Sequence, residues 1–176
     1  VGRGFYHPPT ELPDPDTKKG NISPAYPFGC QIAEVEVDPN TGQVSVTNFV
    51  AAHDVGRAIN PMATEGQIQG GIAQGLGWTL MENMAYQDGK MINGDFVDYI
   101  VPSCFDIPDI KTILVEPIEP NGPYGAKGIG EPALNPTMAA ITNAIYDATG
   151  VRIKELPVNP QKLLAEIQKL GKHVKG

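Results

Sequence analysis

The sequence predicts an α/β fold of the α+β kind, in which a β-hairpin or small mixed sheet packs with about three helices. One observation is a strict alternation of apolar and acidic residues over 33–37, and the other is a set of later segments with helical apolar spacing. A chain of 176 residues, 41% of them apolar, can bury a core. Because the sequence opens on Val1 rather than on methionine, we expect a piece of a longer domain.

The strands follow from the alternation. In residues 33–37, alanine and valine alternate with glutamate, which is typical of a strand with one wet face. Residues 38–42 read Asp-Pro-Asn-Thr-Gly and predict a turn. The second strand of the hairpin carries its apolar residues at Val44, Val46 and Val50. A further strand is expected around Ile110 to Glu116.

A helix is expected from about Met62 to Tyr86, with a stripe of apolar residues spaced by four: Ile68, Ile72, Leu76, Leu80 and Met84. The same stretch contains five glycines, each of which costs a helix interior roughly 1 kcal/mol relative to alanine. They are Gly66, Gly70, Gly71, Gly75 and Gly77. Close packing against another helix and close approach to a bulky ligand both account for them.

Two more helices begin at Asn-Pro pairs and end at glycine. The first runs from Asn135-Pro136 to Gly150, with its buried face at Met138, Ile141, Ile145 and Ala148. The second runs from Asn159-Pro160 to Gly171, with its buried face at Leu163, Leu164, Ile167 and Leu170. Residues 1–27 are rich in proline and predict an extended arm, which leaves residues 28–176 for the folded part.

Composition excludes several classes of function. A net charge of −7 argues against nucleic-acid binding, and no long apolar run or export signal suggests a membrane protein. Cys30 and Cys104 are too few for a disulfide framework or a zinc knuckle, so we expect a reducing, cytoplasmic setting. His53 beside Asp54 has no second cluster at metal-binding spacing, which favours a locally hydrogen-bonded histidine over a metal ligand.

Residues 125–132, Gly-Ala-Lys-Gly-Ile-Gly-Glu-Pro, are typical of an active-site loop, because three glycines leave the backbone open to a rigid anionic ligand. The pattern from Gly128 matches the dinucleotide fingerprint formally, but no apolar strand precedes it. A Walker loop requires a serine or threonine directly after its lysine, and Gly128 follows Lys127 instead. Ordinary nucleotide binding is therefore a remote alternative.

Four motifs occur in unbroken order: residues 54–61, 66–71, 74–77 and the loop 125–132. Together they resemble the C-terminal part of the molybdenum-binding (molybdopterin-binding) subunit of the xanthine dehydrogenase and aldehyde oxidase family, the molybdenum hydroxylases. The resemblance runs from about Phe28 to the C-terminus. It also includes three later patterns: Asp98-Tyr99, Ala148-x-Gly150-x-Arg152 and Leu156-Pro157.

The resemblance implies roles for particular residues. Glu131 corresponds to the catalytic base, which takes the proton of a Mo–OH group so that its oxygen attacks an electron-poor carbon, while hydride passes to a sulfido ligand. A base in a dry pocket would have its pKa raised toward working pH. Gln67 corresponds to a glutamine that hydrogen-bonds near the metal centre and the pterin. The remaining contacts to the molybdenum cofactor would come from Gly70, Lys127, Gly128, Ile129 and Gly130.

Each assignment has a plainer alternative. Glu131 could be a solvated loop carboxylate or a helix N-terminal charge near Asn135, and Gln67 a surface side chain. Lys127 could lie near anionic groups or be solvated. The resemblance implies that Glu131 and Gln67 converge on a shared hollow, which an added companion chain could complete.

The resemblance further implies a small-molecule substrate: an N-heterocycle, a purine or an aldehyde. Other pterin and substrate contacts would come from missing segments of the subunit, and iron–sulfur and FAD modules from partner chains or domains. We therefore expect the isolated chain to be inactive. A rival hypothesis is a non-catalytic docking or assembly module that retains the scaffold.

Overall fold

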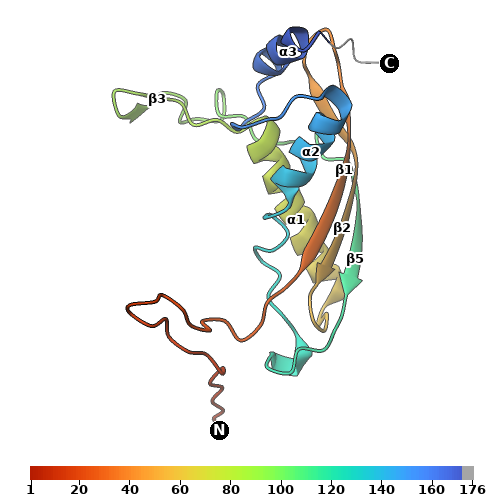
Figure 1. Ribbon diagram of the computed structural model, residues 1–176. Coiled ribbons are helices and arrows are strands. Elements are labelled where there is room, and N and C mark those ends of the chain that lie inside the picture. The colour runs from red at the N-terminus through yellow and green to blue at the C-terminus, as the bar shows by residue number, and fades with distance from the viewer. Residues whose placement is uncertain (172–176) are drawn as a thin grey trace.

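The computed structural model describes residues 1–171, which form a small mixed sheet with helices on one side (Figure 1). Strand β1 (Gly29–Val37) pairs antiparallel with β2 (Val44–Asp54), which pairs parallel with β5 (Asp109–Val115). The sheet order is therefore β1-β2-β5. This arrangement confirms the predicted α/β class. The β1–β2 hairpin forms two of the three strands, and β5 adds the third strand at the edge next to β2.

The hairpin has the expected turn but a different second strand. The Asp38 carboxylate accepts hydrogen bonds from Asn40 and Thr41, and the Gly42 N–H donates to the Asp38 carbonyl. Beyond Val46 a β-bulge shifts the register, which turns alternate residues toward the opposite face. Phe49 and Ala51 consequently enter the core, whereas Val50 is only partly buried.

Helix α1 (Pro61–Leu80) packs beside α2 and against β5, and starts where the Asn60 side chain accepts a hydrogen bond from Ala63 N–H. The middle of the predicted stripe is buried, at Ile68, Ile72 and Leu76. The helix ends six residues earlier than predicted, and Met84 is exposed. Beyond the helix end, the Asn93 side chain hydrogen-bonds the Asn83 carbonyl and the Ala85 N–H, which are groups that a continued helix would pair within itself.

Helix α2 (Thr137–Thr149) packs against β1 and α1, and α3 (Pro160–Lys169) closes the end of the core. Asn159 caps α3 as predicted, whereas α2 begins after Pro136 without a side-chain cap from Asn135. Gly150 and Gly171 have positive φ angles at the two helix ends. The buried faces match the prediction except at two exposed positions, Ala148 and Leu170.

Two segments project from the side of the molecule on which the helices lie (Figure 1). One is the proline-rich segment 1–27, which has no helix or strand. The other carries the short hairpin of β3 (Tyr86–Gln87) and β4 (Lys90–Met91). Within residues 1–171, no helix is both long and apolar enough to cross a membrane.

Candidate functional site

The loop that contains Glu131 is fastened to the end of β2. The Lys127 N–H donates to the Val55 carbonyl at 2.9 Å, and the Arg57 N–H donates to the Gly125 carbonyl at 2.7 Å. The first of the four motifs and the last are therefore joined backbone to backbone. Their contact places the glycine loop beside the start of α1.

Gly56 allows this contact. Its φ is +58°, and a Cβ at this position would overlap the carbonyl oxygen of Gly125. Any other residue would be strained by its backbone angle and would also push the loop away. This glycine is required by the close approach of two backbones.

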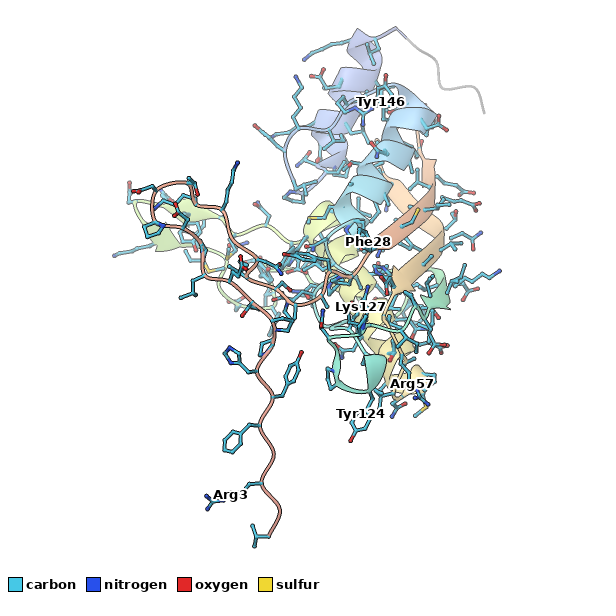
Figure 2. All side chains as sticks on the ribbon, turned by 60° about the horizontal axis from the view of Figure 1, so that its bottom comes forward. Arg3, Phe28, Arg57, Tyr124, Lys127 and Tyr146 are labelled. Atoms are coloured by element: carbon cyan, nitrogen blue, oxygen red, sulfur yellow. The ribbon has the colours of Figure 1, made fainter. Side chains whose placement is uncertain are left out.

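Lys127 forms the second link between the two motifs. Its Nζ lies 2.6 Å from Asp54 Oδ2 and 3.9 Å from Glu119 Oε2, and donates to the Tyr26 carbonyl at 3.2 Å. Figure 2 shows Lys127 just below Phe28, whose ring centroid is 5.8 Å from Nζ. The Lys127 side chain is only 9% exposed. The alternative of a solvated lysine is therefore wrong, and the anionic groups near Lys127 belong to this chain.

Gln67 lies beside a hollow of about 240 Å³ between the start of α1 and the loop. Val55 and Arg57 line one wall, and Ile129 lines another. The Gln67 side chain is exposed, and among residues 1–171 it has no hydrogen-bond partner. Its amide is free to donate and to accept.

Glu131 lies beside a second hollow, of about 540 Å³, on the other side of the loop. Gly128 and Gly130 line it together with the carboxylate, and Ser23 and Pro24 of the N-terminal segment close one side. The Glu131 side chain is exposed in this chain. The dry pocket expected for a catalytic base is therefore not formed by these residues alone.

The two hollows adjoin but are separate, whereas one shared cavity was expected. Ala126 and Lys127 line both of them, so the loop itself is the partition. Ile129 lies on the side of Gln67, and the flanking glycines lie on the side of Glu131. Within this chain the two residues line different hollows because a loop has two faces, and neither motif spacing nor residue type predicted which face each residue would use.

The exposed backbone of the loop fits the polar rim of a pterin cofactor. Within the described part of the chain, the N–H groups of residues 128–131 make no hydrogen bonds. Nothing lies within 4 Å of a Cβ placed on Gly128 or Gly130. These unpaired N–H groups can donate to polar atoms of a ligand, and the free amide of Gln67 offers a further donor on the other side of the loop. No group of three metal-ligating side chains occurs in residues 1–171.

Gly70 lies elsewhere. It lines an open groove of about 550 Å³ between α1 and the start of β5, together with Gly66 and Ile107. Nothing in the described chain lies within 4 Å of a Cβ on Gly66 or Gly70. By contrast, Cβ atoms on Gly71 and Gly75 would come within 2.9 and 2.7 Å of Ala133 and Thr137. Close packing therefore explains why glycine occupies positions 71 and 75. No contact within the described chain requires glycine at positions 66 and 70.

Comparison with known proteins decides the family. The profile described as "Molybdopterin cofactor-binding domain" matches residues 1–108, which include the N-terminal segment. The chain belongs to this family. Its relatives are molybdenum-binding parts of the xanthine dehydrogenase and aldehyde oxidoreductase enzymes, as the resemblance implied.

Three relatives illustrate the match. The xanthine dehydrogenase molybdenum-binding subunit of Escherichia coli O157:H7 is 37% identical over 95% of this chain and 23% of its own length. The structure of aldehyde oxidoreductase from Desulfovibrio gigas superimposes with a TM-score of 0.84 at 38% identity, over 90% of this chain and 17% of that chain. The structure of quinoline 2-oxidoreductase from Pseudomonas putida 86 superimposes with a TM-score of 0.72 at 40% identity, over 77% of this chain and 18% of that chain. The chain thus spans about a fifth of the length of these relatives.

Proposed function

We propose that this chain is the part of a molybdenum hydroxylase that supplies the catalytic base. The enzyme would oxidatively hydroxylate a carbon of an N-heterocycle, a purine or an aldehyde, with oxygen from water. The observation that carries the proposal is the loop 128–131, which offers backbone N–H groups unpaired among the described residues and ends in the exposed carboxylate of Glu131. The relatives support the substrate classes, because their names refer to xanthine, aldehyde and quinoline.

The molybdenum cofactor, when bound, would accept the two electrons removed from the substrate carbon. Glu131 would accept, at a carboxylate oxygen, the proton of the attacking water-derived oxygen, which makes that oxygen a better nucleophile. Gln67 would donate from its amide to the cofactor edge and accept through its carbonyl. The N–H groups of residues 128–130 would hold the cofactor's polar rim, and Lys127 would support this backbone through Asp54.

The rest of the subunit would enclose this site. Residues outside this chain would cover Glu131, select the substrate and complete the cofactor contacts, with iron–sulfur and flavin modules on partner chains or domains. Two cysteines cannot ligate a [2Fe–2S] cluster. Both are free and exposed, which agrees with a reducing cytoplasm. We expect no turnover from the isolated chain.

The experiment that tests the proposal replaces Glu131 with glutamine in the assembled molybdenum enzyme. Glutamine keeps the size of the side chain but cannot accept the proton, so kcat should fall by about 100-fold to 10,000-fold while the molybdenum content stays unchanged. Glu36→Gln, on an exposed position of β1, is the matched control and should leave kcat unchanged. An unaltered kcat in Glu131→Gln would refute the assigned role.

A non-catalytic docking module is the second candidate, and exposed apolar side chains in the segment that follows the β3–β4 hairpin favour it. Phe96 is 83% exposed and Phe105 is 95% exposed, which is typical of side chains that a partner covers. Metal analysis of the natively purified complex separates the candidates. One molybdenum per assembly supports the enzyme, and a stable complex without molybdenum supports the module.

A further inference from the structure

A partly buried polar cluster lies just outside the two hollows and connects β1 to the start of α2. Gln31 Nε2 donates to the Ala133 carbonyl at 2.7 Å and lies 3.0 Å from His53 Nε2. Thr137 Oγ1 lies 2.7 Å from Gln31 Oε1 and 2.9 Å from the Ala133 carbonyl oxygen, and its single proton serves these two acceptors. Every polar atom of the Gln31 side chain therefore has a partner, and we call this group the Gln31 clamp.

The Ala133 carbonyl fixes the orientation of the Gln31 amide. With the amide reversed, Oε1 would face the Ala133 carbonyl, and two acceptors would repel each other. The amide nitrogen must therefore face both Ala133 and His53, and His53 Nε2 must accept. His53 is then neutral with its proton on Nδ1, which is buried and has no partner among residues 1–171. Burial lowers the pKa of His53, which favours this neutral form.

The clamp holds the turn that follows Glu131. Leu134 N–H donates to the Glu131 carbonyl at 3.0 Å, so Glu131 and Ala133 belong to one turn. At the other end of the loop, Lys127 N–H is bound to the Val55 carbonyl. Between Lys127 and this turn the backbone N–H groups make no hydrogen bonds in the described chain. The position of the Glu131 carboxylate therefore depends on these two anchors and on Ile129, which packs against the core between them.

We propose that Gln31 is a positioning residue for Glu131, acting through the Ala133 carbonyl, and that neutral His53 holds the Gln31 amide in the required orientation. The inference rests on the proposed function, since it assigns Gln31 to the same reaction. Gln31 occupies an inward position of β1, where an apolar residue would otherwise complete the core with Ala33 and Val35. A polar residue at this position gives up apolar burial to anchor the turn.

The first test needs neither molybdenum nor turnover. In the protein as expressed, Gln31→Met keeps the side-chain length and removes the clamp. Hydrogen exchange at the Leu134 amide should rise about tenfold or more, the effect of losing roughly one buried hydrogen bond. Gln168→Met, on the exposed face of α3, is the matched control and should change nothing. Unchanged exchange at Leu134 in folded Gln31→Met would overturn the proposal.

If Gln31→Met does not fold, hydrogen exchange at the Leu134 amide is measured in Thr137→Val instead. Valine keeps the shape of threonine and removes the hydroxyl that contacts both Gln31 Oε1 and the Ala133 carbonyl. The orientation of the amide would then be held only by Ala133 and His53, and exchange at Leu134 should rise by a smaller factor. Exchange equal to that of the unaltered protein would count against the clamp.

The second test uses the assembled enzyme. Gln31→Met should lower kcat about 10-fold to 100-fold, as expected for a misplaced base, with molybdenum content and KM unchanged. If Gln31 were only structural, Gln31→Met would lower the amount of molybdenum-loaded enzyme and leave the kcat of the loaded enzyme unchanged. That result would overturn the positioning role of Gln31 and leave the proposed function of the chain standing. A normal kcat in Glu131→Gln would remove the proposed function and, with it, the positioning role. Hydrogen exchange at Leu134 in Gln31→Met tests the clamp without turnover, so it distinguishes a failure of the proposed function from the absence of the clamp.

Discussion

Lys127 Nζ and Asp54 Oδ2 lie 2.6 Å apart although 73 positions separate them in the sequence. Both side chains are about one-tenth exposed, at 9% and 10%. The pair joins the end of β2 to the glycine loop, beside the backbone contact at Gly56. The ion pair between Lys127 and Asp54, which is largely shielded from solvent, thereby fixes one end of the glycine loop.

Removing one member of this pair should destabilise the protein strongly. Lys127→Met leaves Asp54 buried without its cation, which costs about 3–5 kcal/mol and lowers Tm by about 6–20 °C in a chain of this size. The control is Lys162→Met, which breaks the exposed pair with Glu155, whose side chains are 76% and 81% exposed. That change should cost less than about 1 kcal/mol. Equal effects in urea unfolding would show that the Asp54 pair is not desolvated.

The glycines of α1 should respond oppositely to alanine. Gly66→Ala meets no atom within 4 Å and replaces a poor helix former, so it should stabilise the chain by up to about 1 kcal/mol. Gly71→Ala brings a methyl group within 2.9 Å of the Ala133 Cβ and should destabilise by about 1–3 kcal/mol. Both variants are compared by thermal unfolding. Stabilisation by Gly71→Ala would contradict the packing explanation.

The same comparison extends to Gly70 in the assembled enzyme. Gly70→Ala should stabilise the isolated chain as Gly66→Ala does, because its surroundings are equally open. If Gly70 lets the cofactor or its supporting backbone approach, the variant should lower the molybdenum content of the complex. A fully loaded complex with Gly70→Ala would remove Gly70 from the predicted cofactor contacts.

Local patterns predicted most of the fold because they report local physics. Alternation in β1, the Asp38 turn and the Asn159 cap depend on neighbours a few residues away, and the structure has all three. The bulge after Val46 and the early end of α1 were missed. Both depend on partners that the spacing of apolar residues does not encode, namely the facing strand and the Asn93 side chain.

The site was harder to predict than the fold. Motif order was enough to suggest that the segments of Asp54 and Lys127 belong to one site, but their ion pair depends on how the loop docks on β2. The Gln31 clamp was missed altogether. Its one sequence signal was a glutamine at an inward position of an alternating strand, where a polar residue implies buried hydrogen bonds.

His53 should make stability fall as the solution is acidified below neutrality. Burial lowers its folded pKa below the usual 6.5, so under mild acid the unfolded chain binds a proton that the folded chain does not. The free energy of unfolding therefore decreases as pH drops through 6.5 toward the folded pKa. His53→Gln should flatten this slope in urea unfolding between pH 7 and pH 6. His7→Gln, on the exposed arm, is the matched control, and a slope unchanged by His53→Gln would exclude His53 as its source.

Gln67→Ala should separate cofactor binding from chain stability. In the isolated chain the Gln67 amide is exposed and unpaired among the described residues, so its loss should change stability by less than about 0.5 kcal/mol. In the assembled enzyme the same change should lower the molybdenum content, since the amide would no longer donate to the cofactor edge. Gln74→Ala, at an exposed position of the same helix, should leave the metal content unchanged. Equal molybdenum content in the two variants, measured on purified complexes, would make Gln67 a bystander and leave the loop backbone as this chain's remaining cofactor contact.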